Sequence, residues 1–239
     1  MSAGALAAAE PAPALVLCAH GTRGAAGAVR AHAHTLAARG VFPEVHGGAL
    51  YGTPRVDCVL CGLGPRPVTL VPFMMAAGYT LNTLHQRVRA HPYGAHVHIT
   101  DPVGIRPEIT PMIAEMGVAT ARAQGWRAGE VALLIVGHGT RKHARSGETA
   151  RRAATTIDLD GRFAEVATAF LDEPPSVGEA VAALRAPACV AVGFFTDAGD
   201  HGQDDVPELL AETGAATAYA GPVGPDARMA DVIARQAGA

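Results

Sequence analysis

The chain has 239 residues, of which 49% are hydrophobic and 17% are charged, and its formal net charge at pH 7 is −3. This balance provides core material for one large domain or two ordinary ones and excludes a disordered chain. A pI near 6.4 gives no electrostatic reason to expect nucleic-acid binding. The longest apolar runs, such as residues 190–195, are too short to cross a bilayer, so we expect no membrane partner.

The first residues and the cysteines bear on location. Residues 1–13, MSAGALAAAEPAP, lack the basic start and long apolar centre of a signal peptide, and we interpret them as a flexible leader. Four cysteines in a chain this long do not indicate a disulfide framework. We therefore predict a cytoplasmic protein.

The elements expected after the leader alternate between strand and helix. Residues 14–19 form a continuous apolar run, which is typical of a parallel strand buried on both faces. An Ala-rich helical segment follows at 25–39, then a short strand (VHGGAL) and a helix that we expect to begin near Pro54, because proline is tolerated in the first helical turn. Two further strands, VTLVPF and HVHIT, complete the first half.

The second part of the chain repeats this order. Its strands are VALLIVG, EVATAFL, CVAVGFF and ATAYAG, with helices expected at 144–156 and from Pro175. About four strand–helix units in each half predict an α/β fold with doubly wound parallel sheets.

Short motifs recur in both halves in one order, which indicates an internal duplication. LVLCAHGTRG resembles LIVGHGTRKH, and the later matches pair ALYGTPRV with FLDEPPSV, PFMMAAGYT with GFFTDAGDH, and DPVG with GPVG. We assign the halves to residues 14–124 and 131–239, with GWRAGE at the join. Because one chain already contains both halves, we expect a monomer.

Candidate ligands follow the predicted strands. His20 and His138 each follow the first strand of a half, and Glu173 and His201 follow the second and third strands of the second half. A single histidine at a strand end is commonly structural. Its recurrence beside a second histidine and a carboxylate instead favours a site for a divalent first-row metal ion, placed beyond the carboxyl ends of the strands.

These motifs resemble the class II chelatases, especially the sirohydrochlorin cobalto- and ferrochelatases in their long two-unit form. The His-Gly-Thr-Arg turn is similar to the family's HGSR opening, and FFTDAGDHGQDDVPELL is similar to its Phe-rich strand with Gly-x-His and Asp-Ile-Pro. FLDEPPSV resembles the family's acidic strand end with Pro-Ser, and GPVG resembles its Gly-Pro turn. The resemblance covers almost the whole chain and implies sheets that face a central cleft.

The resemblance also implies a reaction, the insertion of Co²⁺ or Fe²⁺ into sirohydrochlorin or a close tetrapyrrole, in cobalamin or siroheme synthesis. Ligand type does not separate these ions from Ni²⁺. The metal is a substrate, and no permanently bound cofactor is expected. A neighbouring carboxylate can act as ligand or general base. Because the ring carries carboxylates, cationic groups are expected at the cleft rim. The substrate-binding candidates are Arg23, Arg141, Lys142 and His20.

The two halves are not equivalent at the positions of these candidates. Three aligned pairs differ between the halves: His201 and Thr80, Glu173 and Gly52, and Asp172 and Tyr51. The first half therefore retains only His20. We predict that His138, His201 and Glu173 form the catalytic metal site, and that the first half walls the cleft.

Other polar residues have competing interpretations. Asp197, Asp200, Asp204 and Asp205 surround His201, and we assign them to helix N-termini rather than to cation relay. His96 and His98 share one face of a predicted strand, which leaves an auxiliary metal site open. Cys58 and Cys61 have redox or metal spacing, but we predict buried packing within a helix. The remaining histidines considered are assigned to the surface: His32, His34, His85, His91 and His143.

Two other functions would use similar histidine motifs. A protein that sequesters metal or delivers a tetrapyrrole without turnover would share the ligands, although it would not need a carboxylate poised beside two imidazoles. A histidine phosphatase would place arginine directly before the histidine, whereas Ala19 and Gly137 stand there, so that function is set aside.

Overall fold

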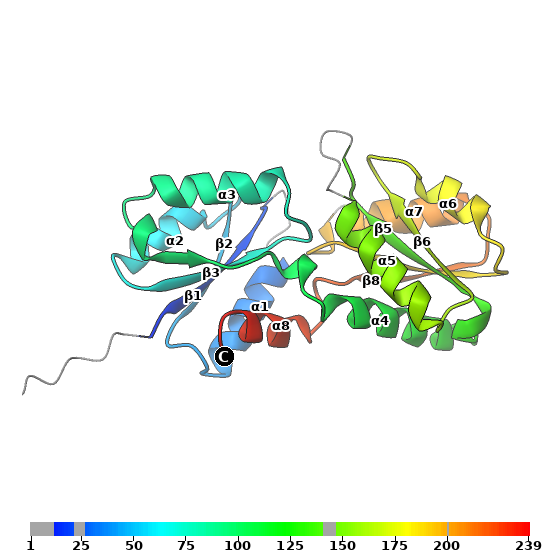
Figure 1. The fold of residues 1–239 in the computed structure, drawn as a ribbon, viewed down its shortest axis with the longest axis horizontal. Coiled ribbons are helices and arrows are strands. Elements are labelled where there is room, and N and C mark those ends of the chain that lie inside the picture. Colours follow the sequence, from blue (N-terminus) through cyan, green and yellow to red (C-terminus); the bar gives the residue numbers. More distant parts are fainter. Residues whose placement is uncertain (1–11, 22–26, 141–146, 200) are drawn as a thin grey trace, which may run out of the picture.

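The computed structural model describes residues 12–21, 27–140, 147–199 and 201–239, except that the side chain of His201 lies outside the described part. Two four-stranded parallel sheets lie side by side, each flanked by helices (Figure 1). The first half contains β1 (Ala14–Ala19), α1 (Gly27–Ala38), β2 (Val45–Ala49), α2 (Val56–Leu63), β3 (Val68–Phe73), α3 (Tyr79–Ala90), β4 (Val97–Ile99) and α4 (Ile109–Ala123). The second half contains β5 (Ala132–Gly137), α5 (Glu148–Asp160), β6 (Glu165–Phe170), α6 (Val177–Ala183), β7 (Cys189–Gly193), α7 (Val206–Glu212), β8 (Thr217–Pro222) and α8 (Met229–Gln236).

The sheets have the same topology, with strand orders β2-β1-β3-β4 and β6-β5-β7-β8. The central strands β1 and β5 are buried along their whole length, as expected for strands covered by helices on both faces. The α/β fold and the doubly wound parallel sheets predicted from the sequence are confirmed. Because all strands of a sheet run the same way, their carboxyl ends lie along one edge, and the candidate ligands follow at that edge.

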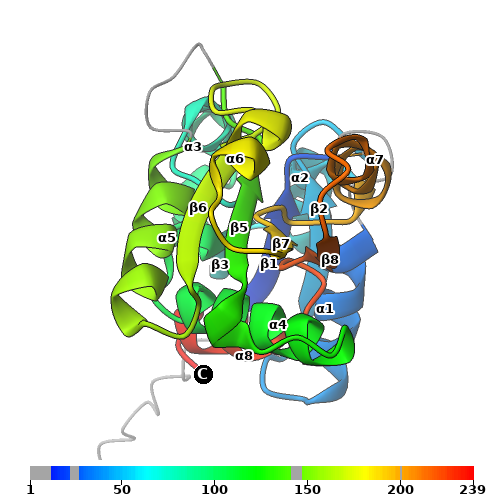
Figure 2. The ribbon, with the colours of Figure 1, turned by 90° about the vertical axis from the view of Figure 1, so that its right-hand side faces the viewer.

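The last helix of each half packs against the other half. Helix α4 contacts β7, β8 and α5, and its Gly117 lies so close to β5 that a Cβ there would stand 2.7 Å from Leu133 Cδ1. Helix α8 packs on α1, where Asp231 pairs with Arg39 at 2.5 Å. Figures 1 and 2 show both helices crossing to the partner half. The repeated units of sequence are therefore not the units of packing.

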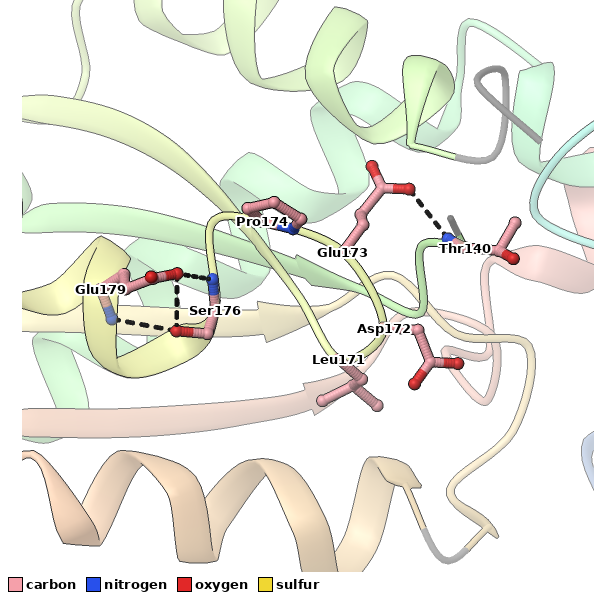
Figure 3. A pocket seen from close by; sticks show the side chains of 7 residues that line it. All are labelled: Thr140, Leu171, Asp172, Glu173, Pro174, Ser176 and Glu179. Carbon is pink, nitrogen blue, oxygen red and sulfur yellow. Dashed lines mark hydrogen bonds between the residues drawn. The ribbon is translucent and has the colours of Figure 1, made fainter. Parts of the chain in front are cut away.

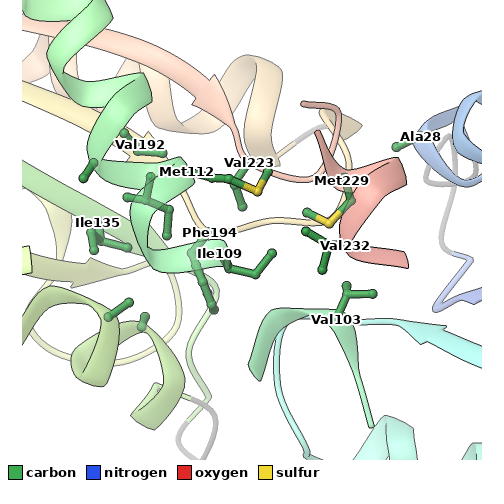
Figure 4. Close-up of a cluster of buried hydrophobic side chains, with 14 of the residues drawn as sticks. Ala28, Val103, Ile109, Met112, Ile135, Val192, Phe194, Val223, Met229 and Val232 are labelled. Carbon is green, nitrogen blue, oxygen red and sulfur yellow. The ribbon is translucent and has the colours of Figure 1, made fainter. Parts of the chain in front are cut away.

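A hydrophobic core shared by both halves results from this exchange (Figure 4). It joins the inner face of the first sheet, including Leu15 and Phe73, to that of the second, including Ile135 and Val192, through side chains of α4 and α8 such as Met229. Separate cores lie on the outer faces, under α2 and α3 and under α6 and α7. The two halves are thus fixed to each other by burial of apolar surface.

Helix starts and cysteines depart from the sequence predictions. Pro54 and Pro175 do not lie in a first helical turn, because each follows a cis peptide bond and its helix begins two residues later. Cys58 and Cys61 are both exposed, so the prediction of buried packing was wrong. Their helix, α2, buries the opposite face through Val56 and Leu60.

The predictions for the histidines are only partly confirmed. His34 is exposed, as expected, and His143 lies outside the described residues. His32 was wrongly assigned to the surface. It is 4% exposed, its Nε2 lies 2.7 Å from the carbonyl oxygen of Gly224, and its ring centroid is 5.5 Å from that of Phe73. His96 lies in a 3₁₀ turn at Gly94–His96 rather than in the strand that holds His98.

The second half leaves a pocket where the first half has buried its histidine. Gly104 and Phe194 align with Gly224 and Phe73, and with residues of α5 they line a pocket of about 320 Å³. The α5 side of this pocket includes Thr149 and Arg152. The two halves therefore differ at an equivalent position of the same architecture, with a buried histidine in the first half and a pocket in the second. Within the described residues, no helix is long and apolar enough to span a membrane.

Candidate metal and substrate site

The histidines that follow the two central strands lie near each other. The pKa of His20 is lowered, first because the ring is half buried and second because His138 acts on its charge across the boundary between the halves. The carboxyl edges of both sheets therefore face a shared region, as the strand-end argument predicts. His201, which follows β7, opens a short π-helical turn at His201–Asp205.

The carboxylate that contacts His138 belongs to Asp172. Asp172 Oδ2 lies 3.2 Å from His138 Nδ1, and the carbonyl oxygen of Gly139 lies 3.2 Å from the same nitrogen. Both partners are acceptors, so Nδ1 carries the proton and Nε2 keeps its lone pair in the neutral ring. A carboxylate behind a histidine fixes the tautomer and ring orientation of metal-binding imidazoles.

Glu173, the carboxylate predicted as a metal ligand, has two protein partners. Its Oε2 accepts a hydrogen bond from the backbone N–H of Thr140 at 2.8 Å, and its Oε1 lies 2.5 Å from Arg151 Nη2. The Glu173 side chain is only 10% exposed. These contacts tie the turn after β5 to the first part of α5, so Glu173 braces the loop that carries His138.

The turn after His138 depends on a glycine. Gly139 has a φ of +69°, a region that favours glycine, and a Cβ there would lie 2.5 Å from Glu173 Cγ. Gly21 in the first half repeats this geometry, with a φ of +85° and a Cβ position 2.5 Å from Ala49. The glycine lets the chain turn sharply after the strand and brings the next strand-end loop against it.

An open pocket of about 600 Å³ lies beside this turn (Figure 3). Its rim includes the two neighbouring carboxylates, Asp172 and Glu173, together with Thr140. Ser176 and Glu179 close its other side and form a capping box at the start of α6, with Glu179 Oε2 accepting from Ser176 N at 2.8 Å. The pocket is acidic on the side of His138, which suits a cation more than an anion.

The first half presents aromatic rings at the matching positions. Tyr51, which aligns with Asp172, packs edge-on against His20 with ring centroids 5.2 Å apart. Arg87 lies behind it, with Cζ 5.5 Å from the tyrosine ring and Nη1 bonded to the carbonyl oxygen of Leu50. Tyr51 and Tyr79 are 50% and 72% exposed. Tyr79 begins α3, directly before Thr80, so both rings stand at the carboxyl edge of the first sheet.

The aspartates near His201 support the helix-terminus interpretation in part. Asp197 Oδ2 accepts from the backbone N–H of Ala28 in the first turn of α1, at 3.0 Å. The helix that it caps belongs to the other half, which the sequence did not indicate. Asp205 is the N-cap residue of α7, and Asp200 lies outside the described residues.

Several predicted site residues lie outside the described residues: Arg23, Arg141, Lys142 and the side chain of His201. Among the side chains that are described, no group of three or more His, Cys, Asp or Glu residues is arranged to hold a metal ion. His96 and His98 are among these described side chains, and they belong to no such group. The predicted set of His138, His201 and Glu173 stays a prediction, because one of its members is not described.

Sequence reasoning missed three side chains that shape the site. Asp172 was noted only through its alignment with Tyr51, although its place one residue before Glu173 puts it in the same strand-end loop. Arg151 and Arg87 lie on α5 and α3, and no local motif marks them as partners of the site. A search for cations on the helix after each central strand would have returned Arg151 together with Arg30 and Arg152, but not Arg87 on α3.

Comparisons with known proteins agree with this architecture. The chain is 25% identical to the probable sirohydrochlorin cobaltochelatase of Halobacterium salinarum, over 94% of this chain and 90% of that protein. It matches the structure described as CbiX, the terminal enzyme for biosynthesis of siroheme in denitrifying bacteria, with a TM-score of 0.76 and 25% identity over 94% of this chain and 97% of that one.

Two more distant structures share the fold. SirB from Bacillus subtilis, solved with Fe³⁺, matches with a TM-score of 0.72 at 15% identity and covers 94% of each chain. The multi-domain protein DR2241 from Deinococcus radiodurans matches with a TM-score of 0.75 at 23% identity over 95% of this chain, which spans 55% of that longer protein. The sequence model of the CbiX family matches twice, at residues 14–117 and 132–238. The chain therefore belongs to the CbiX family, as a two-unit member.

Proposed function

We propose that this protein inserts a divalent metal ion, Co²⁺ or Fe²⁺, into sirohydrochlorin or a closely related tetrapyrrole. The observation that carries the proposal is the His138–Asp172 pair, which stands at the strand edge of the second sheet, near His20 of the first. Family membership and the names of the relatives supply the substrate class. The metal and the ring are both substrates.

The second half is the metal side of the reaction. In this proposal His138 Nε2 and His201 hold the ion, and Asp172 holds His138 in the tautomer that leaves Nε2 its lone pair. Imidazoles bind such ions less tightly than thiolates do, so the ion can pass to the ring. Insertion also releases two pyrrole protons. The carboxylate of Asp172 lines the pocket and is placed to accept one.

Glu173 is the third proposed ligand, and its contacts define the test of that role. To share a metal with His138 its carboxylate must give up part of its bonding to Arg151. We expect Glu173→Gln to weaken metal binding about tenfold, as the loss of a charged ligand group requires. Arg151→Met removes the same brace and also the cation that competes for the carboxylate, so metal affinity should not fall. Equal effects of both variants, measured by calorimetric metal titration, would reduce Glu173 to a brace.

The first half is the ring side. A tetrapyrrole macrocycle presents a broad flat face, and exposed aromatic rings stack on such faces. Tyr51 and Tyr79 are exposed at the edge of the first sheet that corresponds to the edge where the second half carries Asp172. We assign the two tyrosines to packing against the macrocycle, which places the ring between aromatic groups and the metal ligands.

An insertion assay tests the function. Purified protein is mixed anaerobically with sirohydrochlorin and Co²⁺, Fe²⁺ or Ni²⁺ in turn, and the change in the visible spectrum of the ring is followed against the protein-free rate. We expect catalysed insertion with Co²⁺ or Fe²⁺. His34→Ala, on the exposed face of α1, is the control for histidine loss away from the site. Binding of the ring without faster insertion would point to a carrier instead.

A further inference from the structure

Two exposed cysteines lie one helical turn apart, away from the proposed metal site. Cys58 and Cys61 occupy the third and sixth positions of α2, and both are solvent-exposed. Residues three apart on an α-helix share a face, and helix geometry places their Cα atoms about 5 Å apart. That separation falls within the range that a disulfide spans. The Cβ atoms at this spacing are about 5–6 Å apart and must approach to about 4 Å in a disulfide, so joining the two sulfur atoms requires a local adjustment of α2 but not its unfolding.

A histidine from the neighbouring helix contacts one of the sulfur atoms. His91, the C-cap residue of α3, has its Nε2 3.2 Å from Cys61 Sγ. Its other nitrogen, Nδ1, accepts a hydrogen bond from the backbone N–H of Tyr93 at 3.2 Å. A backbone N–H can only donate, so the proton of the neutral ring is on Nε2 and points at the sulfur. This donor favours Cys61 as the sulfur that attacks.

The other two cysteines are chemically inert in the folded protein. Burial raises the pKa of the Cys18 thiol to about 12, and burial likewise raises that of Cys189 to about 12. Neither can form a thiolate near neutral pH. Any reaction of the native protein with a mild oxidant is thus directed to Cys58 and Cys61.

We propose that Cys58 and Cys61 form a redox-active dithiol that closes to an intrahelical disulfide by exchange with a low-molecular-weight disulfide. The Cys61 sulfur loses its proton to solvent and attacks one sulfur of the reagent, and a thiolate leaves. The Cys58 sulfur then loses its proton and displaces the second thiolate from Cys61. Two cysteine thiols are oxidised, the reagent disulfide is reduced to two thiols, and no metal ion or tetrapyrrole takes part.

The test uses the reduced full-length protein and oxidised glutathione under native conditions. Two of the four thiols should be lost, with no glutathione retained, and peptide mass spectrometry should place the new disulfide between Cys58 and Cys61. Cys58→Ser should instead trap one glutathione on Cys61, because the resolving thiol is gone. Retention of two glutathiones by the native protein, or retention of all four thiols, would overturn the proposal.

The role of His91 has its own matched pair of variants. His91→Gln should slow the first exchange step about tenfold, which is the size of effect expected from loss of one hydrogen bond to a developing anion. His85→Gln, on the same helix, is the control and should react at the wild-type rate. Equal rates for the two variants would show that Cys61 reacts without help from His91, and would limit the proposal to the dithiol alone.

Discussion

The two halves share topology but differ in what they place at the same edge of the sheet. The second half sets His138 against Asp172 and holds Glu173 on Arg151, whereas the first sets His20 against Tyr51. A polar pair suited to a cation thus stands where its partner half has two rings packed edge to face. Because the helices, strands and glycine turns are matched, the difference lies in a few side chains. The two halves thus share a scaffold but carry different side chains at its carboxyl edge.

Removing the histidine from each half should give the largest contrast. We expect His138→Ala to lower the insertion rate at least about 100-fold, because it removes a proposed metal ligand. His20→Ala should lower it less than about tenfold, because His20 is expected to contact substrate rather than hold the metal. Both rates are measured by the spectral assay. Equal losses would mean that the first half contributes a ligand after all, and the comparison would fail.

Substitution of the residues that contact these histidines should also lower activity more in the second half than in the first. Asp172→Asn keeps the shape of the side chain but removes the charge behind His138, and losses of about 10- to 100-fold are typical for such supporting carboxylates. Tyr51→Phe keeps the ring beside His20 and should change activity little. Rates and calorimetric metal affinities of both variants are compared with wild type. Full activity in Asp172→Asn would remove the argument for the His138 tautomer.

The aromatic face can be tested without touching the metal side. The double variant Tyr51→Ala, Tyr79→Ala should raise the KM for the tetrapyrrole about tenfold, since each ring contact contributes on the order of 0.5–1.5 kcal/mol. Metal affinity, measured by calorimetry in the absence of the ring, should stay at the wild-type value. An unchanged KM would show that the exposed tyrosines do not contact the macrocycle.

The smallest expected effect is on the pH dependence of stability, and it concerns His32, the buried histidine of the first half. Burial lowers the pKa of His32, so the folded protein binds fewer protons there than the unfolded chain does. The stabilisation is complete above the unfolded value near ~6.5 and is lost as pH falls through the folded value. His32→Gln should therefore show a shallower fall in unfolding free energy between about pH 7 and about pH 5 than wild type.

Urea denaturation at several pH values measures this slope. His34→Gln, an exposed position on the same helix, serves as the control and should keep the wild-type slope. A slope in His32→Gln equal to that of wild type would place the linked proton on another group. The equivalent pocket, between Gly104 and helix α5 of the second half, has no histidine among its lining residues, so we expect the effect from the first half.

Local patterns in the sequence predicted the sheets well, because β1 and β5 are continuous apolar runs and need no knowledge of the rest of the chain. The repeat likewise predicted that His20 and His138 occupy matching strand ends, and these two histidines lie near each other. Side-chain partners were less accessible. Glu173 turns toward Arg151 because of the path of a loop, and His32 is buried because Gly224 approaches from the other half. The exposed face of α2 was misjudged because Cys58 and Cys61 stand among apolar neighbours.

The exchange of α4 and α8 has a consequence for how the protein is made. Ribosomes release the first sheet early, but α8, the helix that covers its inner face beside α1, emerges only after the second sheet is complete. A chain synthesised at about 5–20 residues per second therefore carries its first sheet and α1 without the contacts of α8 for several seconds. A truncated product ending before residue 229 would lack these contacts, and the apolar surface that α8 covers would stay exposed.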